Sequence, residues 1–162
     1  MTEGYRVVVE KDYLKFSAAH FIAYRGFREP LHGHNYHVSV SLSGTVGADG
    51  YVLDFGIVKG VTKAVCEALD ERVLIPAASD CLTVTQEGPS VVLVYEDGAR
   101  FVFPATDCVL LPIVHASAEE LAAYVLARLR EGLGAHAMRG LSEIEVGVSE
   151  APGQAAYCRA QL

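Results

Sequence analysis

Two histidines separated by a single residue place the strongest constraint on the fold of this chain. His32 and His34 flank Gly33, in a segment that continues as an alternating strand pattern. On an extended chain, residues two apart point to the same face, about 7 Å apart along the strand. An extended conformation therefore brings both imidazoles to one site, where they form half of a metal-binding site.

A third imidazole is available from His20, which ends the apolar run 14–19. Three neutral imidazoles leave one tetrahedral position of Zn²⁺ open, as in catalytic rather than structural zinc sites. Glu29, three residues before His32, is the carboxylate that we expect to act beside such a metal. His37 has the opposite parity to His32 along the strand, so we expect it to face away.

The composition suits a single domain over residues 1–162 with a sizeable core, since 51% of the residues are hydrophobic and the mean hydropathy is +0.27. The net charge of −7 and the lack of a basic run argue against a nucleic-acid partner. Without an apolar segment of about 18 residues or a signal-like N-terminus, we expect a cytoplasmic protein with no membrane partner. The four scattered cysteines are expected to be free thiols.

Alternating and helical patterns predict an α+β fold with helices on one face of an antiparallel sheet. Asp54 caps a predicted helix that runs to about Asp70. Ser117 and Glu120 form a capping box that starts a second helix, which ends at Gly132 or Gly134. The predicted strands cover residues 5–9, 13–19, 34–42, 51–53, 143–150 and 157–160, with a polar break at 10–12.

An insert at 76–112 separates the two helices and is punctuated by prolines. Within it, residues 91–95 and 100–103 flank the turn 96–99 and predict a hairpin. Its purpose does not follow from the sequence.

Five motifs, in this order and at these intervals, resemble those of the 6-pyruvoyltetrahydropterin synthase family, which includes the bacterial 6-carboxytetrahydropterin synthases. The resemblance spans about residues 6–158. Its motifs are Phe16-Ser17-Ala18-Ala19-His20, Leu31-His32-Gly33-His34-Asn35-Tyr36, Gly50-Tyr51-Val52-Leu53-Asp54-Phe55, Leu69-Asp70 and Val148-Ser149-Glu150.

This resemblance implies a tunnelling fold, in which subunits join their sheets into oligomeric barrels and stack as a homohexamer, a dimer of trimers, with active sites between protomers. It also implies that His20, His32 and His34 bind Zn²⁺ and that Glu150 anchors a pterin substrate. The last role is reasonable on chemical grounds, because one carboxylate can accept the two parallel N–H donors of a pterin.

The chain departs from the family at two positions. The usual catalytic cysteine, four residues before the first histidine of His-Gly-His, is replaced by Arg28, and Glu29 follows it. This Glu-x-x-His-Gly-His pattern resembles the type III branch, in which a glutamate takes the place of the cysteine. The second departure is Asp70-Glu71, where the family has Asp-His, so Asp70 matches and Glu71 or His115 would have to replace the proton-relay histidine.

Three functions remain open from the sequence. The first is a zinc-dependent lyase that cleaves the side chain of 7,8-dihydroneopterin or its triphosphate to 6-hydroxymethyl-7,8-dihydropterin, with Glu29, Asp70 and Glu71 catalytic. The second is an ordinary 6-pyruvoyl- or 6-carboxytetrahydropterin synthase, and the third is a catalytically silent pterin-binding protein. Glu150 and, as a side possibility, Ser117 would contact the substrate in the first.

Overall fold

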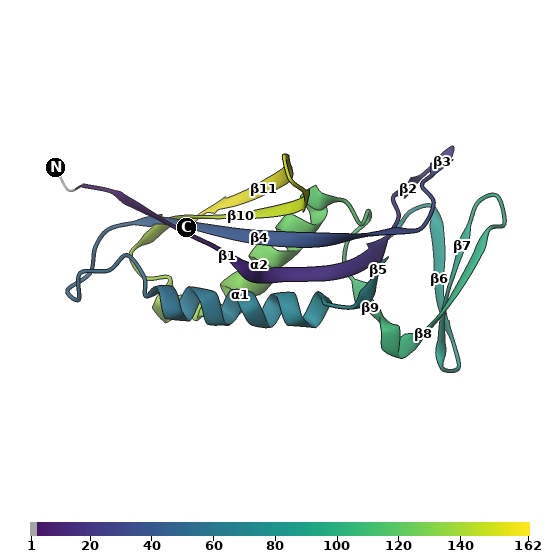
Figure 1. Cartoon of the computed structure of the whole chain (residues 1–162), viewed down its shortest axis with the longest axis horizontal. Helices are drawn as coiled ribbons and strands as arrows, with labels where there is room; N and C mark the ends of the chain where they lie inside the picture. Colours follow the sequence, from purple (N-terminus) through teal and green to yellow (C-terminus); the bar gives the residue numbers. More distant parts are fainter. Residues whose placement is uncertain (1–2) are drawn as a thin grey trace.

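A six-stranded sheet covered on one face by two helices forms the body of the protein (Figure 1). The computed structural model describes residues 3–162. The strands lie in the order β11 (Gln154–Gln161), β10 (Leu141–Ala151), β4 (His32–Gly44), β1 (Tyr5–His20), β5 (Arg72–Pro76) and β9 (Cys108–Leu111).

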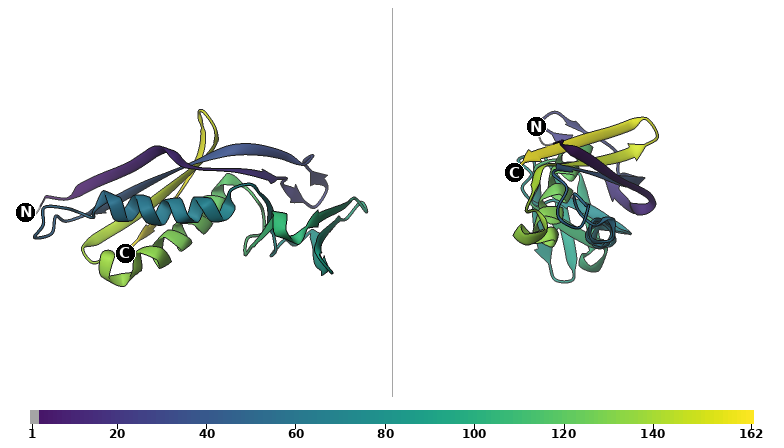
Figure 2. Two further views of the ribbon diagram at one scale, coloured as in Figure 1. Left: turned by 60° about the horizontal axis from the view of Figure 1, so that its bottom comes forward. Right: turned by 90° about the vertical axis from the view of Figure 1, so that its left-hand side faces the viewer.

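The helices α1 (Phe55–Leu69) and α2 (Ala118–Ala137) run along the same side of this sheet, as the turned view in Figure 2 makes clear. Asp54 caps α1 by accepting a hydrogen bond from the Gly56 amide at 2.6 Å, and Asp70 ends it. Ser117 caps α2. The predicted α+β arrangement, with both helices on one face, is confirmed.

Alternation along the central strands explains why the helices cover this face. The side chains of Val38, Val40 and Leu42 on β4, and of Ile144 and Val146 on β10, are at most 1% exposed. They pack with the apolar faces of both helices into one core, while the intervening serine and glutamate side chains lie on the opposite face.

The sheet is mixed rather than wholly antiparallel. β11, β10, β4 and β1 pair antiparallel, but β5 and β9 add to the edge of β1 in parallel orientation. The predicted break at residues 10–12 is wrong, because β1 is continuous and accommodates the polar residues with a shift of register against β4 between Glu10 and Lys15.

Two further boundaries differ from prediction. Residues 51–53 form no strand, since the Gly47 amide closes a turn on the Tyr51 carbonyl at 2.8 Å. Helix α2 extends to Ala137, past both predicted ends, although its helical geometry is interrupted at Gly134, one of those two ends, where φ is 72°, a value that only glycine adopts readily.

The insert is more structured than a hairpin. The predicted strands are present as β7 (Ser90–Tyr95) and β8 (Arg100–Pro104), and β6 (Leu82–Glu87) joins them to make a three-stranded antiparallel sheet. This sheet lies beyond the helices at one end of the molecule (Figures 1 and 2). It faces a small hairpin of β2 (Ala23–Tyr24) and β3 (Phe27–Arg28) across a second hydrophobic core.

The four cysteines are free, as predicted. Cys66 is buried in the main core, and this burial raises the pKa of its thiol to about 12. Within residues 3–162, no helix is both long and apolar enough to cross a membrane.

Candidate metal centre and surrounding site

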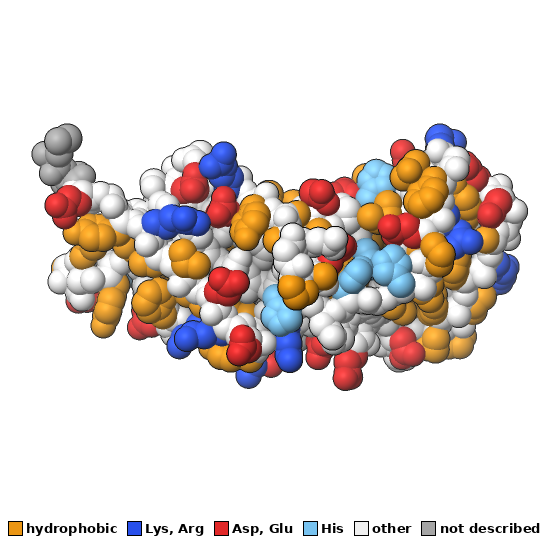
Figure 3. Space-filling view, turned by 45° about the horizontal axis from the view of Figure 1, so that its top comes forward, with side chains coloured by type: hydrophobic (Ala, Val, Ile, Leu, Met, Phe, Trp, Pro, Cys, Tyr) orange, Lys and Arg blue, Asp and Glu red, His pale blue; other side chains and the backbone are white. Residues whose placement is uncertain are grey.

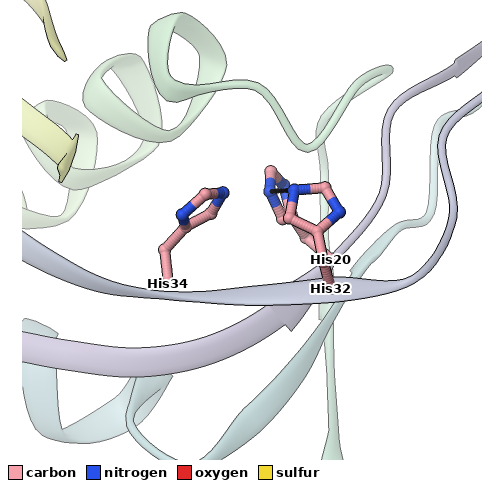
Figure 4. Close-up of side chains that lie close together, drawn as sticks. All are labelled: His20, His32 and His34. Carbon is pink, nitrogen blue, oxygen red and sulfur yellow. Dashed lines mark hydrogen bonds between the residues drawn. The ribbon is translucent and has the colours of Figure 1, made fainter.

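The imidazoles of His20, His32 and His34 converge on one point (Figure 4). Strand pairing produces this arrangement, because His20 at the end of β1 lies directly opposite His32 at the start of β4. His34 is opposite Ala18, whose small side chain leaves room for the rings. Nitrogen atoms of the three rings lie within 4.8 Å of one another, and His32 and His34 share a face of β4, as the parity of that strand predicts.

Two backbone carbonyls fix the orientation of two of these rings. The Nδ1 atom of His20 lies 2.6 Å from the Ala116 carbonyl oxygen, and Nδ1 of His32 lies 2.8 Å from that of Pro30. A carbonyl only accepts hydrogen bonds, so each Nδ1 carries the proton and each Nε2 presents a lone pair. Carbonyls often hold metal-binding histidines in this way.

The remaining contact fits a metal ion. The Nε2 atoms of His20 and His32 lie 3.1 Å apart. With both Nδ1 atoms protonated, two lone pairs face each other, which is unfavourable unless a cation or a proton lies between them. Burial is the main cause that lowers the pKa of His20, so a proton is disfavoured there. The donor set and its spacing therefore suit a divalent metal such as Zn²⁺.

Glu150 lies beside the histidines, with Oε1 3.9 Å from Nε2 of His20. The side chain is at the end of β10, close to the irregularity in its pairing with β11. Glu150 and His34 also line a cavity of about 940 Å³ between β4 and the β10–β11 turn. Figure 3 shows histidine and acidic side chains exposed on this face, in the half of the molecule that carries β2 and β3.

Tyr36 is a member of this cluster that the sequence analysis did not select. It follows His32 and His34 on the same face of β4, and its ring lies 5.4 Å from that of His34 and 5.8 Å from that of His20. The parity that identified the histidines also applies to Tyr36, so the signal was present in the sequence.

The hydroxyl of Tyr36 is buried and, among residues 3–162, has no hydrogen-bond partner. Burial first, and then the negative charges of Glu150 and Glu29, raise its pKa well above the usual range. Both carboxylates are thus within electrostatic reach of the phenol, which stays protonated and can donate to a bound molecule.

Glu29 follows the β2–β3 hairpin and bonds twice to Ile22 at the other end of it. Its amide donates to the Ile22 carbonyl at 2.9 Å, and its Oε2 accepts from the Ile22 amide at 2.8 Å. This places a half-buried carboxylate three residues from the first histidine of the His-Gly-His segment, in a fixed orientation.

Asp70 and Glu71 are not brought to the three histidines within one chain. Asp70 ends α1 and accepts from the Ser17 amide at 2.7 Å, which ties the helix to β1. Glu71 has a left-handed backbone, with φ of 56°, and lines a second cavity of about 480 Å³, which His34 borders, with Ser17 and Asn35. Those residues alternate with the histidines on β1 and β4, so this cavity belongs mainly to the other face of the sheet.

Ser117 and Glu120 hold the start of α2 beside the metal centre. The Ser117 hydroxyl accepts from the Glu120 amide at 3.3 Å, as predicted. The Glu120 carboxylate does not return to Ser117, as a capping box would require, but instead accepts from the amides of Val114 and His115. His115 is thereby bound to Glu120 and is not among the three converging histidines.

Comparison with known proteins places these observations in a family. The family model described as 6-pyruvoyl tetrahydropterin synthase matches residues 9–161. A Methanocaldococcus jannaschii protein, provisionally described as a 6-carboxy-5,6,7,8-tetrahydropterin synthase, is 31% identical over 92% of this chain and 91% of its own length.

Solved structures agree closely with the fold. The 6-pyruvoyl tetrahydropterin synthase of Plasmodium falciparum is 41% identical, with a TM-score of 0.97 over 99% of this chain and all of the other. A Plasmodium vivax structure, described as a catalytic residue mutant with alanine in place of a glutamate, is 39% identical, with a TM-score of 0.95 over 99% of both chains. The predicted tunnelling fold is confirmed, whereas the oligomeric barrel stays a prediction.

The first prediction concerns the metal. We expect the purified protein to bind one Zn²⁺ per chain and His32→Ala to lose this binding, because two imidazoles leave the ion under-coordinated. The measurement is metal content after dialysis. His37→Ala is the control, since His37 is exposed and lies outside the converging set. Equal metal content in both variants would contradict the assignment.

The second prediction concerns the unpaired hydroxyl of Tyr36. We expect Tyr36→Phe to raise the free energy of unfolding of the metal-free protein by about 1 kcal/mol, because it removes a buried donor without a partner. Tyr95→Phe should lower it by a similar amount, since the Tyr95 hydroxyl donates to the Tyr24 carbonyl at 2.8 Å. Urea denaturation measures both values. A clear loss of stability in Tyr36→Phe would show that its hydroxyl is bonded in solution.

Proposed function

Because this chain belongs to the 6-pyruvoyl tetrahydropterin synthase family, we propose that it is a zinc-dependent pterin lyase. Its substrate is 7,8-dihydroneopterin or its triphosphate, and its pterin product is 6-hydroxymethyl-7,8-dihydropterin. The observation that carries this proposal is a glutamate, Glu29, held in a fixed orientation three residues before the first histidine of His-Gly-His, next to the position where the synthases carry a cysteine. Family membership itself places the chain in pterin biosynthesis.

In this proposal His20, His32 and His34 hold the Zn²⁺. The bound ion supplies a Lewis acid for the hydroxyl groups of the substrate side chain. The carbonyls of Ala116 and Pro30 keep the rings of His20 and His32 in the tautomer that a metal requires.

Glu150 anchors the pterin ring. Its carboxylate accepts the 2-amino group and the adjacent ring N–H, a paired interaction that fixes both the position and the tilt of the ring. The cavity that Glu150 and His34 line has a volume of about 940 Å³, within the range of small-molecule pockets. Because Glu150 is also close to His20, anchoring the ring directs the side chain of the substrate towards the histidines.

Glu29 acts as the general base. It takes the proton of the 2′-hydroxyl, the C2′–O bond becomes a carbonyl, and the C1′–C2′ bond breaks. The electron pair of that bond moves into the pterin ring, and C1′ then receives a proton, which protonated Glu29 can return. Atoms and charge balance without a further reagent, and the second product is a small aldehyde that keeps any phosphate.

A carboxylate suits this reaction better than a thiolate would. It accepts a proton from oxygen, whereas the thiolate of the ordinary synthases removes a proton from carbon. The Plasmodium vivax relative described as a catalytic glutamate mutant supports a catalytic carboxylate in proteins of this shape.

Asp70, Glu71 and Ser117 have supporting roles in the proposal. Since Glu71 lies outside the converging set of histidines and lines a cavity that it shares only with His34 among them, Asp70 and Glu71 would serve a neighbouring protomer, in a homohexamer with active sites between subunits. Ser117 lies next to Ala116, whose carbonyl holds His20, and contacts the substrate from the start of α2.

The second candidate is a 6-carboxytetrahydropterin synthase, the provisional description of the archaeal relative. Arg28 in place of the cysteine argues against it, as does Glu71 in place of the relay histidine. The third candidate is a silent pterin-binding protein, which the Asp70-Glu71 pair permits.

The test that separates the three functions is incubation with dihydroneopterin and, separately, with its triphosphate, followed by mass identification of the products. We expect 6-hydroxymethyl-7,8-dihydropterin from at least one of them. Formation of 6-pyruvoyl- or 6-carboxytetrahydropterin instead would select the synthase. Pterin binding without turnover would select the silent protein.

Glu29→Gln tests the base directly. We expect turnover to fall by about 100-fold or more, because the amide cannot accept the proton. Zinc content and pterin affinity should be retained, since the metal ligands and Glu150 are intact. The measurements are steady-state kinetics and metal analysis on the same preparation. Turnover equal to that of the unaltered protein would remove Glu29 from the mechanism.

A further inference from the structure

We propose that the three-stranded sheet β6–β8 acts as a clamp that fixes the hairpin carrying Glu29, and that Arg28 is the positioning residue that joins the two. This inference rests on the proposed function, because it concerns the residue that we assign as the base. It gives the insert a purpose that the sequence alone does not suggest, and it explains what stands in place of the cysteine.

The side chain of Arg28 lies in a cage of aromatic rings. Its guanidinium carbon is 5.0 Å from the ring centre of Phe101, 5.8 Å from that of Phe21 and 6.0 Å from that of Tyr95. Tyr95 and Phe101 belong to the insert, whereas Phe21 lies two residues before the first strand of the hairpin. The rings of Phe21 and Phe101 also stack, at 4.7 Å between centres. The faces of these aromatic rings attract the cation, so the side chain of Arg28 binds both the insert and the segment that leads into the hairpin.

The same guanidinium group reaches the backbone of Glu29. Nη1 of Arg28 donates to the Glu29 carbonyl oxygen at 2.9 Å. The two hydrogen bonds between Glu29 and Ile22 then fix the carboxylate relative to the hairpin. Because Oε2 accepts from the Ile22 amide, we assign the proton transfer to Oε1.

Two more hydrogen bonds join the tip of the hairpin to the insert. The Gly26 amide donates to Oε1 of Glu96 at 2.7 Å, and the Tyr95 hydroxyl donates to the Tyr24 carbonyl at 2.8 Å. Glu96 and Tyr95 follow each other at the end of β7. Two consecutive residues of the insert, Tyr95 and Glu96, therefore hold the tip of the hairpin.

The hairpin needs this support. Its strands, β2 and β3, have two residues each, and an isolated hairpin of that size is not stable in water. The second hydrophobic core supplies the missing stability, since it combines Phe21 and Ala23 with insert residues such as Leu93 and Tyr95. Without the insert, the segment before His32 would lose most of the core against which it packs.

The central experiment replaces Arg28 by methionine, which keeps an unbranched side chain of about the length of the aliphatic part of arginine and removes the charge. We expect kcat to fall roughly 10- to 100-fold, as for a displaced catalytic group, with KM and zinc content little changed. The cost in stability should be small, because the change also removes Nε, a buried donor for which residues 3–162 supply no hydrogen-bond partner. Thermal unfolding measures that cost.

Arg100→Met is the matched control. Arg100 is on β8 in the same insert, but its side chain pairs with Glu87 at 3.0 Å. We expect its kcat to equal that of the unaltered protein. An equal loss in both variants would contradict a specific role for Arg28.

A double variant tests whether Arg28 acts through Glu29. If it does, adding Arg28→Met to Glu29→Gln should cause no further fall in kcat. The glutamine amide cannot act as the base, so its position no longer matters. If the two losses multiply, Arg28 acts elsewhere and the clamp is wrong.

Hydrogen exchange tests the clamp independently of any reaction. We expect Arg28→Met to speed exchange at the amides of Ile22, Gly26 and Glu29, while the centre of β4 stays protected. Exchange at those amides equal to that of the unaltered protein would overturn the clamp. Failure of the unaltered protein to cleave pterins would instead contradict the proposed function, and the exchange result would still decide the inference.

Discussion

The hydrogen bond between His20 and the carbonyl of Ala116 is the contact on which the rest of the site depends. It connects the end of β1 to the loop before α2, and so joins the sheet to the helical layer at the three converging histidines. Glu120 fixes that loop by accepting from the amides of Val114 and His115. The position of a buried imidazole is therefore set by the first turn of a helix almost 100 residues later in the chain.

Local patterns predicted the parts of the site that lie close together in the sequence. The two-residue period assigned His32 and His34 to one face and excluded His37, and strand pairing then placed His20 opposite His32. The helix caps at Asp54 and Ser117 were predictable for the same reason, because a cap bonds to amides two or three residues away.

Contacts between distant segments were not predictable in this way. β5 and β9 are runs of five and four residues, too short to show a period, and their parallel pairing joins Val73 to Cys108. The partner of His20 is a backbone carbonyl, which leaves no mark on the sequence. The contacts of Arg28 were not predictable either. Two of the rings around its guanidinium group, those of Tyr95 and Phe101, lie about 70 residues further along the chain.

Arg28 stands at the position where the resemblance to the family predicts a cysteine. Its presence there would change how the candidate site responds to oxidants and to electrophiles that attack thiols. Among residues 3–162, no cysteine lines the two larger cavities or belongs to the converging histidine set. Cys66, deep in the main core, has a thiol that hardly ionises at neutral pH. A centre built from imidazole, carboxylate and phenol has no thiol, so the oxidation or alkylation of a catalytic sulfur that silences thiolate enzymes could not inactivate it.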